Sequence, residues 1–137
     1  METFHVLLID SDEETIRKMT KRFSGAGARV ETQSDAGLAL EQIKAEPPDL
    51  IIVSAELPST SGYSLINKLK KGDATGKIPT VLISRTATEE TFLQHQKLKT
   101  AADAYLLVPF SDKKFLKAMN SAAPHLARSL PPVTTEQ

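Results

Sequence analysis

The sequence has no cysteine and no tryptophan, and aromatic residues make up only 5% of its 137 residues. Without cysteine, the chain cannot form a disulfide scaffold, a zinc ribbon or an iron–sulfur centre. Neither sign of charge is in excess, because 17 basic and 17 acidic side chains give a formal net charge of +0. This balance argues against a dedicated nucleic-acid-binding domain, which usually needs a basic surface.

Long apolar runs are also missing. The run near the N-terminus, residues 6–9, is too short for a signal-peptide core or a membrane span, so a cytoplasmic protein without a membrane partner is expected. Hydrophobic residues make up 40% of the chain and charged residues 25%, as in an ordinary globular domain. The length predicts one domain, residues 1–123, followed by a tail or linker at residues 124–137.

Short leucine-rich or β-branched runs alternate with segments of helical periodicity. The expected strands are residues 4–9, 29–33, 50–53, 81–83 and 104–108. This alternation predicts a parallel sheet with right-handed crossovers and helices on both faces. At this length it favours an α/β fold of the flavodoxin-like, doubly wound type, with strand order 2-1-3-4-5 and five helices. Ser11 and Glu14 have capping-box spacing, so Ser11 is expected to cap the first helix.

Ligands of open parallel sheets bind beyond the carboxyl ends of the strands, here at residues 10–12, 54–56, 84–85 and 108–110. Together with their flanking strands these loops resemble the receiver domains of two-component response regulators over residues 4–123. The resemblance lies in the segments VLLIDSDEE (6–14), PDLIIVSAELPSTSGYSLI (48–66), IPTVLISRTA (78–87) and ADAYLLVPF (102–110). It implies the same fold and a role in bacterial signal transduction, in a two-component system or phosphorelay.

The chain departs from the receiver pattern at the residues that perform phosphoryl transfer. A typical receiver has two adjacent acidic residues after its first strand, where this chain has Asp10 and Ser11. The nucleophilic aspartate is replaced by Ser54, and the lysine that contacts the phosphoryl group is replaced by Val108. Because this reaction needs a carboxylate nucleophile, a divalent cation and a phosphoryl-binding cation, the sequence predicts neither aspartyl phosphorylation, nor an enzyme, nor a cofactor.

Alternatives remain open for several residues of this degenerate pocket. Ser54 is interpreted as a small buried polar group bonded to the backbone, rather than as a kinase site. Asp10 and Asp12 are weak candidates for a residual cation site. The alternative is that both are solvated or capped carboxylates, stabilised by the dipole of a nearby helix N-terminus. Two interpretations of Arg85 stay open: it pairs with Asp10, Asp12 or Glu56 and holds the pocket in one state, or it faces solvent.

The resemblance also implies a switch and a docking surface. Ser84 stands at the switch hydroxyl and Tyr105 at the switch aromatic, and both are expected to couple the pocket to a protein-binding face. That face consists of the fourth helix, fifth strand and fifth helix, where His95 and Tyr105 are expected as exposed contact residues; a homodimer through it is a further expectation. His95 as an ordinary surface histidine is the alternative.

These observations predict a non-phosphorylatable pseudo-receiver that acts as a protein–protein interaction module. Its shorter segments NKLKK (67–71) and QHQKLK (94–99) are similar to the atypical receiver of a myxobacterial gliding-motility regulator. The alternative is a receiver whose pocket binds a cation or anion or accepts phosphate on a hydroxyl. DNA binding would belong to sequence outside this chain, since its lysine cluster at residues 68–77 lacks interleaved aromatic residues and is interpreted as a solvated face.

Overall fold

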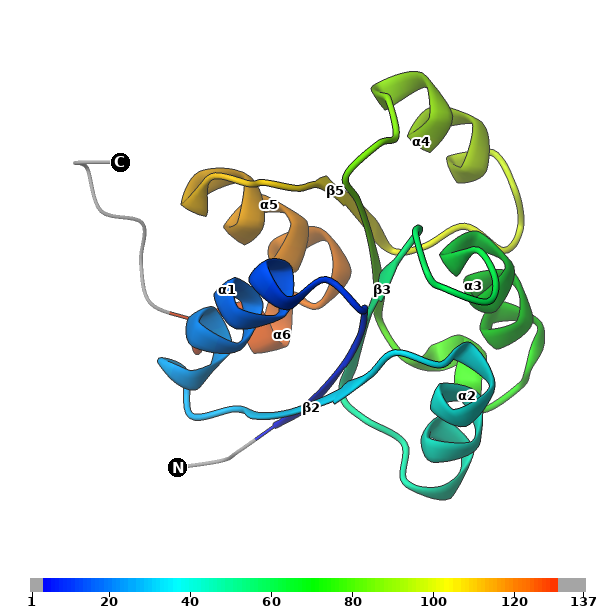
Figure 1. The fold of residues 1–137 in the computed structure, drawn as a ribbon. Helices are drawn as coiled ribbons and strands as arrows, with labels where there is room; N and C mark the ends of the chain where they lie inside the picture. The colour runs from blue at the N-terminus through cyan, green and yellow to red at the C-terminus, as the bar shows by residue number, and fades with distance from the viewer. Residues whose placement is uncertain (1–3, 131–137) are drawn as a thin grey trace.

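The computed structural model describes residues 4–130, which form a five-stranded parallel sheet in the order β2-β1-β3-β4-β5 (Figure 1). The strands are β1 (His5–Ile9), β2 (Arg29–Gln33), β3 (Leu50–Ser54), β4 (Thr80–Ser84) and β5 (Ala104–Leu107). Neighbouring strands are in register along their length, with Val6 opposite Leu50 and Ile51 opposite Thr80. The predicted fold and strand order are therefore confirmed.

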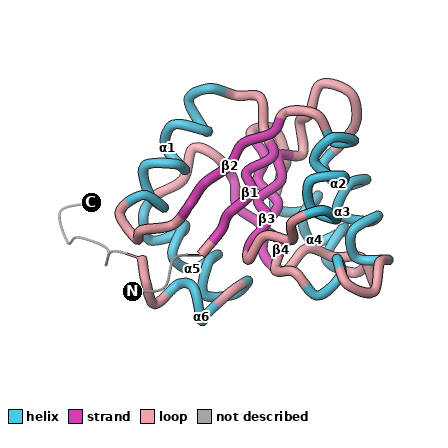
Figure 2. Tube along the Cα trace, turned by 90° about the horizontal axis from the view of Figure 1, so that it is seen from below, coloured by secondary structure: helices cyan, strands magenta, loops and turns pink. Residues whose placement is uncertain are grey.

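The sheet lies between two layers of helices. The described residues form α1 (Glu13–Ser24), α2 (Ala36–Ala45), α3 (Gly62–Lys71), α4 (Glu89–Gln96), α5 (Asp112–Ala122) and α6 (Pro124–Ala127), with a 3₁₀ turn at Thr75–Lys77. Figures 1 and 2 show α1, α5 and α6 on one face and α2, α3 and α4 on the other. None of the helices in this part of the chain is long and apolar enough to cross a membrane.

Continuous apolar strands fit this position because both of their faces are covered. In β1, Val6 and Leu8 belong to the core beneath α1 and α5, whereas Leu7 and Ile9 belong to the core beneath α2 and α3. Every residue of β3 and β4 is buried. The alternation of side chains along a strand thus divides one apolar run between two hydrophobic cores.

The sixth helix corrects the prediction of a tail that starts at residue 124. Proline favours the first turn of a helix, and Pro124 begins α6. Ala127 and Leu130 are each 8% exposed and join the core on the α1 and α5 side. Residues 124–130 therefore pack onto the domain because they bury apolar side chains, while residues 131–137 of the predicted tail lie outside the described residues.

The cap of α1 is also different from the prediction. Asp12, not Ser11, is the N-cap: its Oδ2 accepts hydrogen bonds from the Thr15 N–H at 3.0 Å and the Thr15 hydroxyl at 2.7 Å. Ser11 is exposed, and its N–H donates to Oδ1 of Asp10 at 2.7 Å. The positive end of the helix dipole also stabilises a negatively charged cap, so Asp12 suits this position better than the neutral hydroxyl of Ser11.

Candidate functional site

The carboxyl ends of β1, β3 and β4 meet at one edge of the sheet because these strands are neighbours. Asp10 follows β1, Ser54 ends β3 and Ser84 ends β4, so the loops after these residues share one rim. Direct contacts link Asp10, Glu56 and Arg85 of the predicted pocket across this rim, and Asp12 joins them. That these residues form a functional site stays a prediction.

Asp10 is a buried carboxylate, with 1% of the residue exposed. Its Oδ1 accepts hydrogen bonds from the backbone N–H groups of Ser11 and Asp12, at 2.7 and 3.1 Å. Its Oδ2 accepts a hydrogen bond from Nη1 of Arg85 at 3.4 Å. Both oxygens of the buried carboxylate therefore have partners, as a charge removed from water requires.

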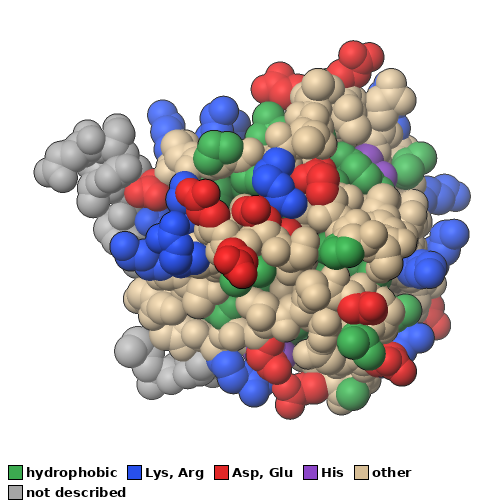
Figure 3. All heavy atoms as spheres, in the orientation of Figure 1, with side chains coloured by type: hydrophobic (Ala, Val, Ile, Leu, Met, Phe, Trp, Pro, Cys, Tyr) green, Lys and Arg blue, Asp and Glu red, His purple; other side chains and the backbone are tan. Residues whose placement is uncertain are grey.

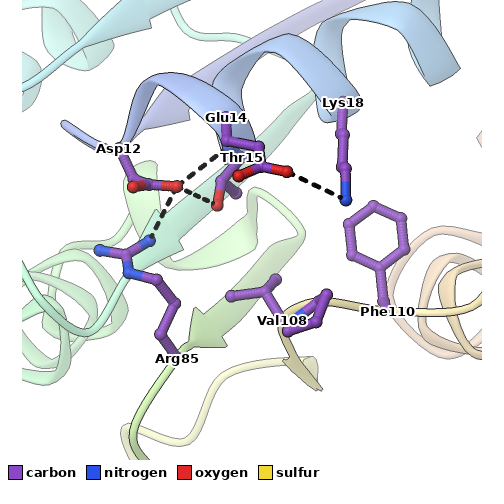
Figure 4. A pocket seen from close by; sticks show the side chains of 8 residues that line it. Asp12, Glu14, Thr15, Lys18, Arg85, Val108 and Phe110 are labelled. Carbon is purple, nitrogen blue, oxygen red and sulfur yellow. Dashed lines mark hydrogen bonds and ion pairs between the residues drawn. The ribbon is translucent and has the colours of Figure 1, made fainter.

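Arg85 lies among three carboxylates. Its Nη1 is 3.8 Å from Oδ2 of Asp12, the contact drawn in Figure 4, and its Nη2 is 4.0 Å from Oε1 of Glu56. The Arg85 side chain is 30% exposed. Of the two open interpretations, the structure therefore shows the pairing with Asp10 and not the solvent-facing arginine. That Arg85 holds the pocket in one state stays a hypothesis.

Glu56 is bonded to the residues that follow β4. Its Oε2 accepts a hydrogen bond from the Ser84 hydroxyl at 2.6 Å, and its Oε1 accepts one from the Arg85 N–H at 2.8 Å. Ser84 is fully buried, and its oxygen accepts in turn from the N–H groups of Thr86 and Ala87, at 3.2 and 2.9 Å. Ser84 is therefore fully bonded within the chain.

Ser54 is fully buried at the position where a receiver would carry its nucleophile. Its Oγ accepts from the N–H of Glu56 at 3.2 Å and donates to the Glu56 carbonyl at 3.4 Å. Gly62 packs directly over this turn: a Cβ on it would lie 2.0 Å from the Ser54 carbonyl oxygen. The interpretation of Ser54 as a buried polar group bonded to the backbone is confirmed.

The residues of the pocket do not fit the magnesium ion that receivers use. Magnesium demands oxygen ligands, usually carboxylates, in near-octahedral order. Here Asp10 uses both oxygens for two N–H groups and a guanidinium, and no carboxylate stands at Ser11 or Ser54. Hydrogen bonds from Thr15, aided by the charge of Arg85, lower the pKa of Asp12, although burial opposes them. A cation would have to displace Arg85, so the geometry favours the capped and paired state of Asp10 and Asp12.

A hollow of about 220 Å³ opens beside the pocket between α1 and the loop after β5 (Figure 4). Arg85, Asp12 and the pair of Glu14 with Lys18, 3.5 Å apart, line one part of it. Val108, which is 7% exposed, and Phe110 line the opposite part with apolar surface. An apolar wall thus stands where the resemblance would place the phosphoryl-binding lysine.

His95 is buried, with 6% exposed, and the expectation of an exposed contact residue is wrong. Its Nδ1 lies 2.5 Å from the Tyr105 hydroxyl and its Nε2 lies 3.1 Å from Oδ1 of Asn67. Oδ1 of Asn67 can only accept, so the ring hydrogen is assigned to Nε2. Nδ1 then accepts the Tyr105 hydroxyl, whose oxygen also accepts the Ala102 N–H at 3.0 Å. Burial lowers the pKa of His95 and raises that of Tyr105, and both shifts favour the neutral side chain.

Sequence reasoning missed the residues that complete these contacts. Asn67 also accepts the Thr100 hydroxyl at 2.7 Å, and Tyr63 packs edge-on against His95 with ring centroids 4.9 Å apart. The Thr86 hydroxyl donates a hydrogen bond to Oε2 of Glu56 at 3.3 Å. Each of these contacts joins different elements, and ordinary asparagine, threonine and tyrosine residues in a single sequence carry no local signal of them.

A groove of about 540 Å³ runs between α4, β5 and α5. Its apolar surface includes Phe92, Tyr105, Leu107 and the side chain of Leu93, which is 55% exposed. The exposed lysines Lys114 and Lys117 of α5 line this groove, and so do the acidic residues Glu89 and Asp103. On the face drawn in Figure 3, acidic and basic side chains are interspersed and form no broad basic surface.

The chain is similar to proteins of known family. Residues 6–120 match the family model of the response regulator receiver domain. The chain is 34% identical over 108 residues to the adventurous-gliding motility protein Z of Myxococcus xanthus, covering 77% of this chain and 8% of that protein. It is 30% identical over 132 residues to the phosphate regulon transcriptional regulatory protein PhoB of Escherichia coli, covering 96% of this chain and 55% of that protein.

Solved structures agree with the observed fold. The chemotaxis protein CheY4 of Vibrio cholerae superimposes with a TM-score of 0.75 at 21% identity, over 88% of this chain and 99% of that one. The chain spans between about a tenth and about half of the length of the curated relatives named above. The match of residues 6–120 to the family model shows that the chain belongs to the response regulator receiver domain family.

Proposed function

We propose that this receiver domain is not phosphorylated on aspartate and that it acts as a protein–protein interaction module in bacterial signalling. The observation that carries the proposal is the state of Ser54. This side chain ends β3, is fully buried, and is bonded to the backbone of its own turn. A neutral, buried hydroxyl with no general base in contact is a poor nucleophile, so the position supports no phosphoryl transfer.

Two further features support the same conclusion. Arg85 holds the place of a cation beside Asp10, and Val108 presents apolar surface where a phosphoryl-binding lysine would be needed. The centre therefore lacks a nucleophile, a metal site and a phosphoryl-binding lysine at once. The fold remains suited to recognition because its groove between α4, β5 and α5 combines apolar surface with flanking charge.

The mass of the intact protein tests the loss of phosphorylation. The chain is incubated with acetyl phosphate and Mg²⁺, beside a receiver that retains its aspartate as a positive control. We expect no adduct on this chain and a gain of about 80 Da, one phosphoryl group, on the control. A gain of that size on this chain would overturn the proposal and favour the alternative, a pocket that accepts phosphate on a hydroxyl.

The occupant that we propose for the groove is a helical segment of another protein. Its apolar face would cover Leu93 and Tyr105, and acidic residues on one flank would face Lys114 and Lys117. Partner helices of this kind bind grooves through apolar anchors at helical spacing, and flanking charge adds specificity.

Crosslinking followed by affinity measurement tests this surface. A photo-crosslinking residue at Leu93 should capture one protein that the same residue at Leu38, 52% exposed on α2, does not capture. Charge reversal at Lys114 and Lys117 should then weaken binding of the purified partner at least about tenfold, which corresponds to about 1.4 kcal/mol. Unchanged affinity would refute the surface, and a dimer of this chain that is lost in the same variants would identify a second copy as the occupant instead.

A further inference from the structure

A histidine and two glutamates come together at the opposite end of β1 from the Arg85 pocket. His5 is the first residue of β1, Glu31 lies in β2, and Glu46 follows the last residue of α2. Their ligand atoms, one ring nitrogen and two carboxylate oxygens, all lie within 4.8 Å of one another. A strand rises about 3.3 Å per residue, which places His5 and Asp10, at the two ends of β1, roughly 16 Å apart. The cluster is therefore separate from the pocket described above.

The parallel pairing of β1 and β2 brings these side chains to one face of the sheet. His5 is opposite Arg29 in the register, so Glu31, two residues further along β2, lies on the same face as His5. Leu7, two residues beyond His5, belongs to the core beneath α2 and α3, which identifies this face. Helix α2 covers it and supplies Glu46 as its C-cap (Figure 1). Three different elements thus contribute one ligand each.

The backbone holds the imidazole of His5 at this position. The His5 N–H donates to Oδ2 of Asp49 at 2.7 Å, and the His5 carbonyl accepts the Asp49 N–H at 2.8 Å. The side chain of His5 is only 12% exposed. Its Nε2 is shielded from water and makes no hydrogen bond to any described residue, although Oε1 of Glu31 lies 2.6 Å away. A buried polar nitrogen normally has a partner, and a cation between Nε2 and this carboxylate would supply one.

The two carboxylates already face one positive charge, that of Arg29. Its Nη2 donates to Oε1 of Glu46 at 3.0 Å and lies 3.9 Å from Oε1 of Glu31. The Arg29 side chain is 56% exposed, and exposed ion pairs contribute little to stability. An arriving cation can therefore displace this guanidinium. The Arg85 pocket differs, because Asp10 there is buried and bonded through both of its oxygens.

We propose that His5, Glu31 and Glu46 form a binding site for a divalent transition-metal ion, of which Zn²⁺ fits best. An imidazole nitrogen with carboxylate oxygens suits zinc, whereas Mg²⁺ and Ca²⁺ take oxygen ligands. Zinc bonds of about 2.0 to 2.2 Å place neighbouring ligands roughly 3.3 Å apart, with a water molecule at the fourth position. Glu31 and Glu46 are 40% and 66% exposed, so both carboxylates can move by the roughly 1 to 1.5 Å that this requires. The ion would join β1, β2 and α2.

Isothermal titration calorimetry with ZnCl₂, on the full chain without an affinity tag, tests the site. We expect one ion to bind with a micromolar dissociation constant, and His5→Ala, Glu31→Gln and Glu46→Gln each to weaken binding at least about tenfold. Arg29→Ala should bind Zn²⁺ more tightly, because the competing guanidinium is gone. His125→Ala, which removes an exposed histidine from α6, is the matched control and should bind as the wild type does. Millimolar Mg²⁺ should not displace the zinc.

The contrary outcomes are equally definite. A wild type that binds no Zn²⁺ while Arg29→Ala does would show that the guanidinium is the permanent counterion, and the proposal would fail. Equal affinities of the wild type and His5→Ala would show that any bound zinc lies elsewhere. If His5→Ala loses its folded circular dichroism spectrum, Glu46→Gln decides, since this exposed carboxylate can be neutralised without unfolding the chain; an unchanged affinity there would also refute the site. The readout is metal binding away from the Ser54 position and the α4 groove, so it is independent of the tests above.

Discussion

Substitution of Arg85 by alanine tests whether an arginine has taken over the role of a cation in this pocket. The change leaves Oδ2 of Asp10 without its guanidinium, while Oδ1 keeps the N–H groups of Ser11 and Asp12. The side chain of Asp10 is 0% exposed, so water cannot replace the lost partner without a change in structure. We therefore expect Arg85→Ala to destabilise the fold rather than only to alter its surface.

The magnitude follows from the burial of the two partners. Removal of one partner from a fully buried pair costs about 3 to 5 kcal/mol, whereas exposed pairs contribute about 0 to 1 kcal/mol. Arg85 is 30% exposed and its nitrogen lies 3.4 Å from the carboxylate, a long hydrogen bond. These values place the expected loss between the two limits, at about 2 kcal/mol.

Urea unfolding followed by circular dichroism at pH 7 measures this loss. Asp10→Asn is introduced in both backgrounds, and the resulting cycle should give a coupling of about 1 kcal/mol between Arg85 and Asp10. Arg17→Ala, on the exposed face of α1, is the control and should stay within about 0.5 kcal/mol of the wild type. A loss below about 0.5 kcal/mol for Arg85→Ala, or no coupling, would show that the backbone amides alone hold Asp10.

Two further predictions concern other elements. Burial lowers the pKa of His95 below the ordinary 6.5, so the unfolded chain binds more protons between the folded pKa and pH 6.5. The contribution of His95 to the free energy of unfolding should therefore be fully present above pH 6.5 and be lost as pH falls through the folded pKa. His95→Gln should reduce the difference between the free energies of unfolding measured by urea titration at pH 7.5 and at pH 5.5. An unchanged difference would contradict the lowered pKa of His95. Gly62→Ala should cost about 2 to 3 kcal/mol, since its Cβ would lie 2.0 Å from the Ser54 carbonyl oxygen. Gly37→Ala, whose Cβ meets only a side-chain oxygen at 3.2 Å, should cost much less in the same assay, and equal losses would contradict the packing argument.

The core strands were predictable because their signal is local. An apolar run such as residues 50–53 is explained only by burial on both faces, and the structure buries all of β3. The beginning of α1 was predicted less well, since Ser11 and Asp12 are both good caps and only the hydrogen bond from Thr15 selects Asp12. Helix α6 was missed because four residues carry too little periodicity, and burial of Ala127 and Leu130 stabilises it.

His95 illustrates a different limit. The resemblance placed it on the docking face and so suggested an exposed residue, but it is one of the two buried residues of α4, with Phe92. The burial of this imidazole depends on Asn67 of α3, 28 positions away, and on Tyr105 of β5. A polar side chain is buried when partners satisfy both of its nitrogens, and those partners come from elements whose proximity no local pattern encodes.

The sequence by itself determined the order of the strands and of the first five helices, the edge of the sheet where Asp10, Glu56 and Arg85 meet, and the absence of the carboxylate and lysine that phosphoryl transfer needs. These properties follow from hydrophobic periodicity and from the identity of single residues. Only the tertiary structure decided that Arg85 contacts Asp10 across 75 positions, and that the Glu56 carboxylate contacts the Ser84 hydroxyl. Such pairings depend on which strands lie side by side and on how far each side chain extends, and both are set when the whole sheet has formed.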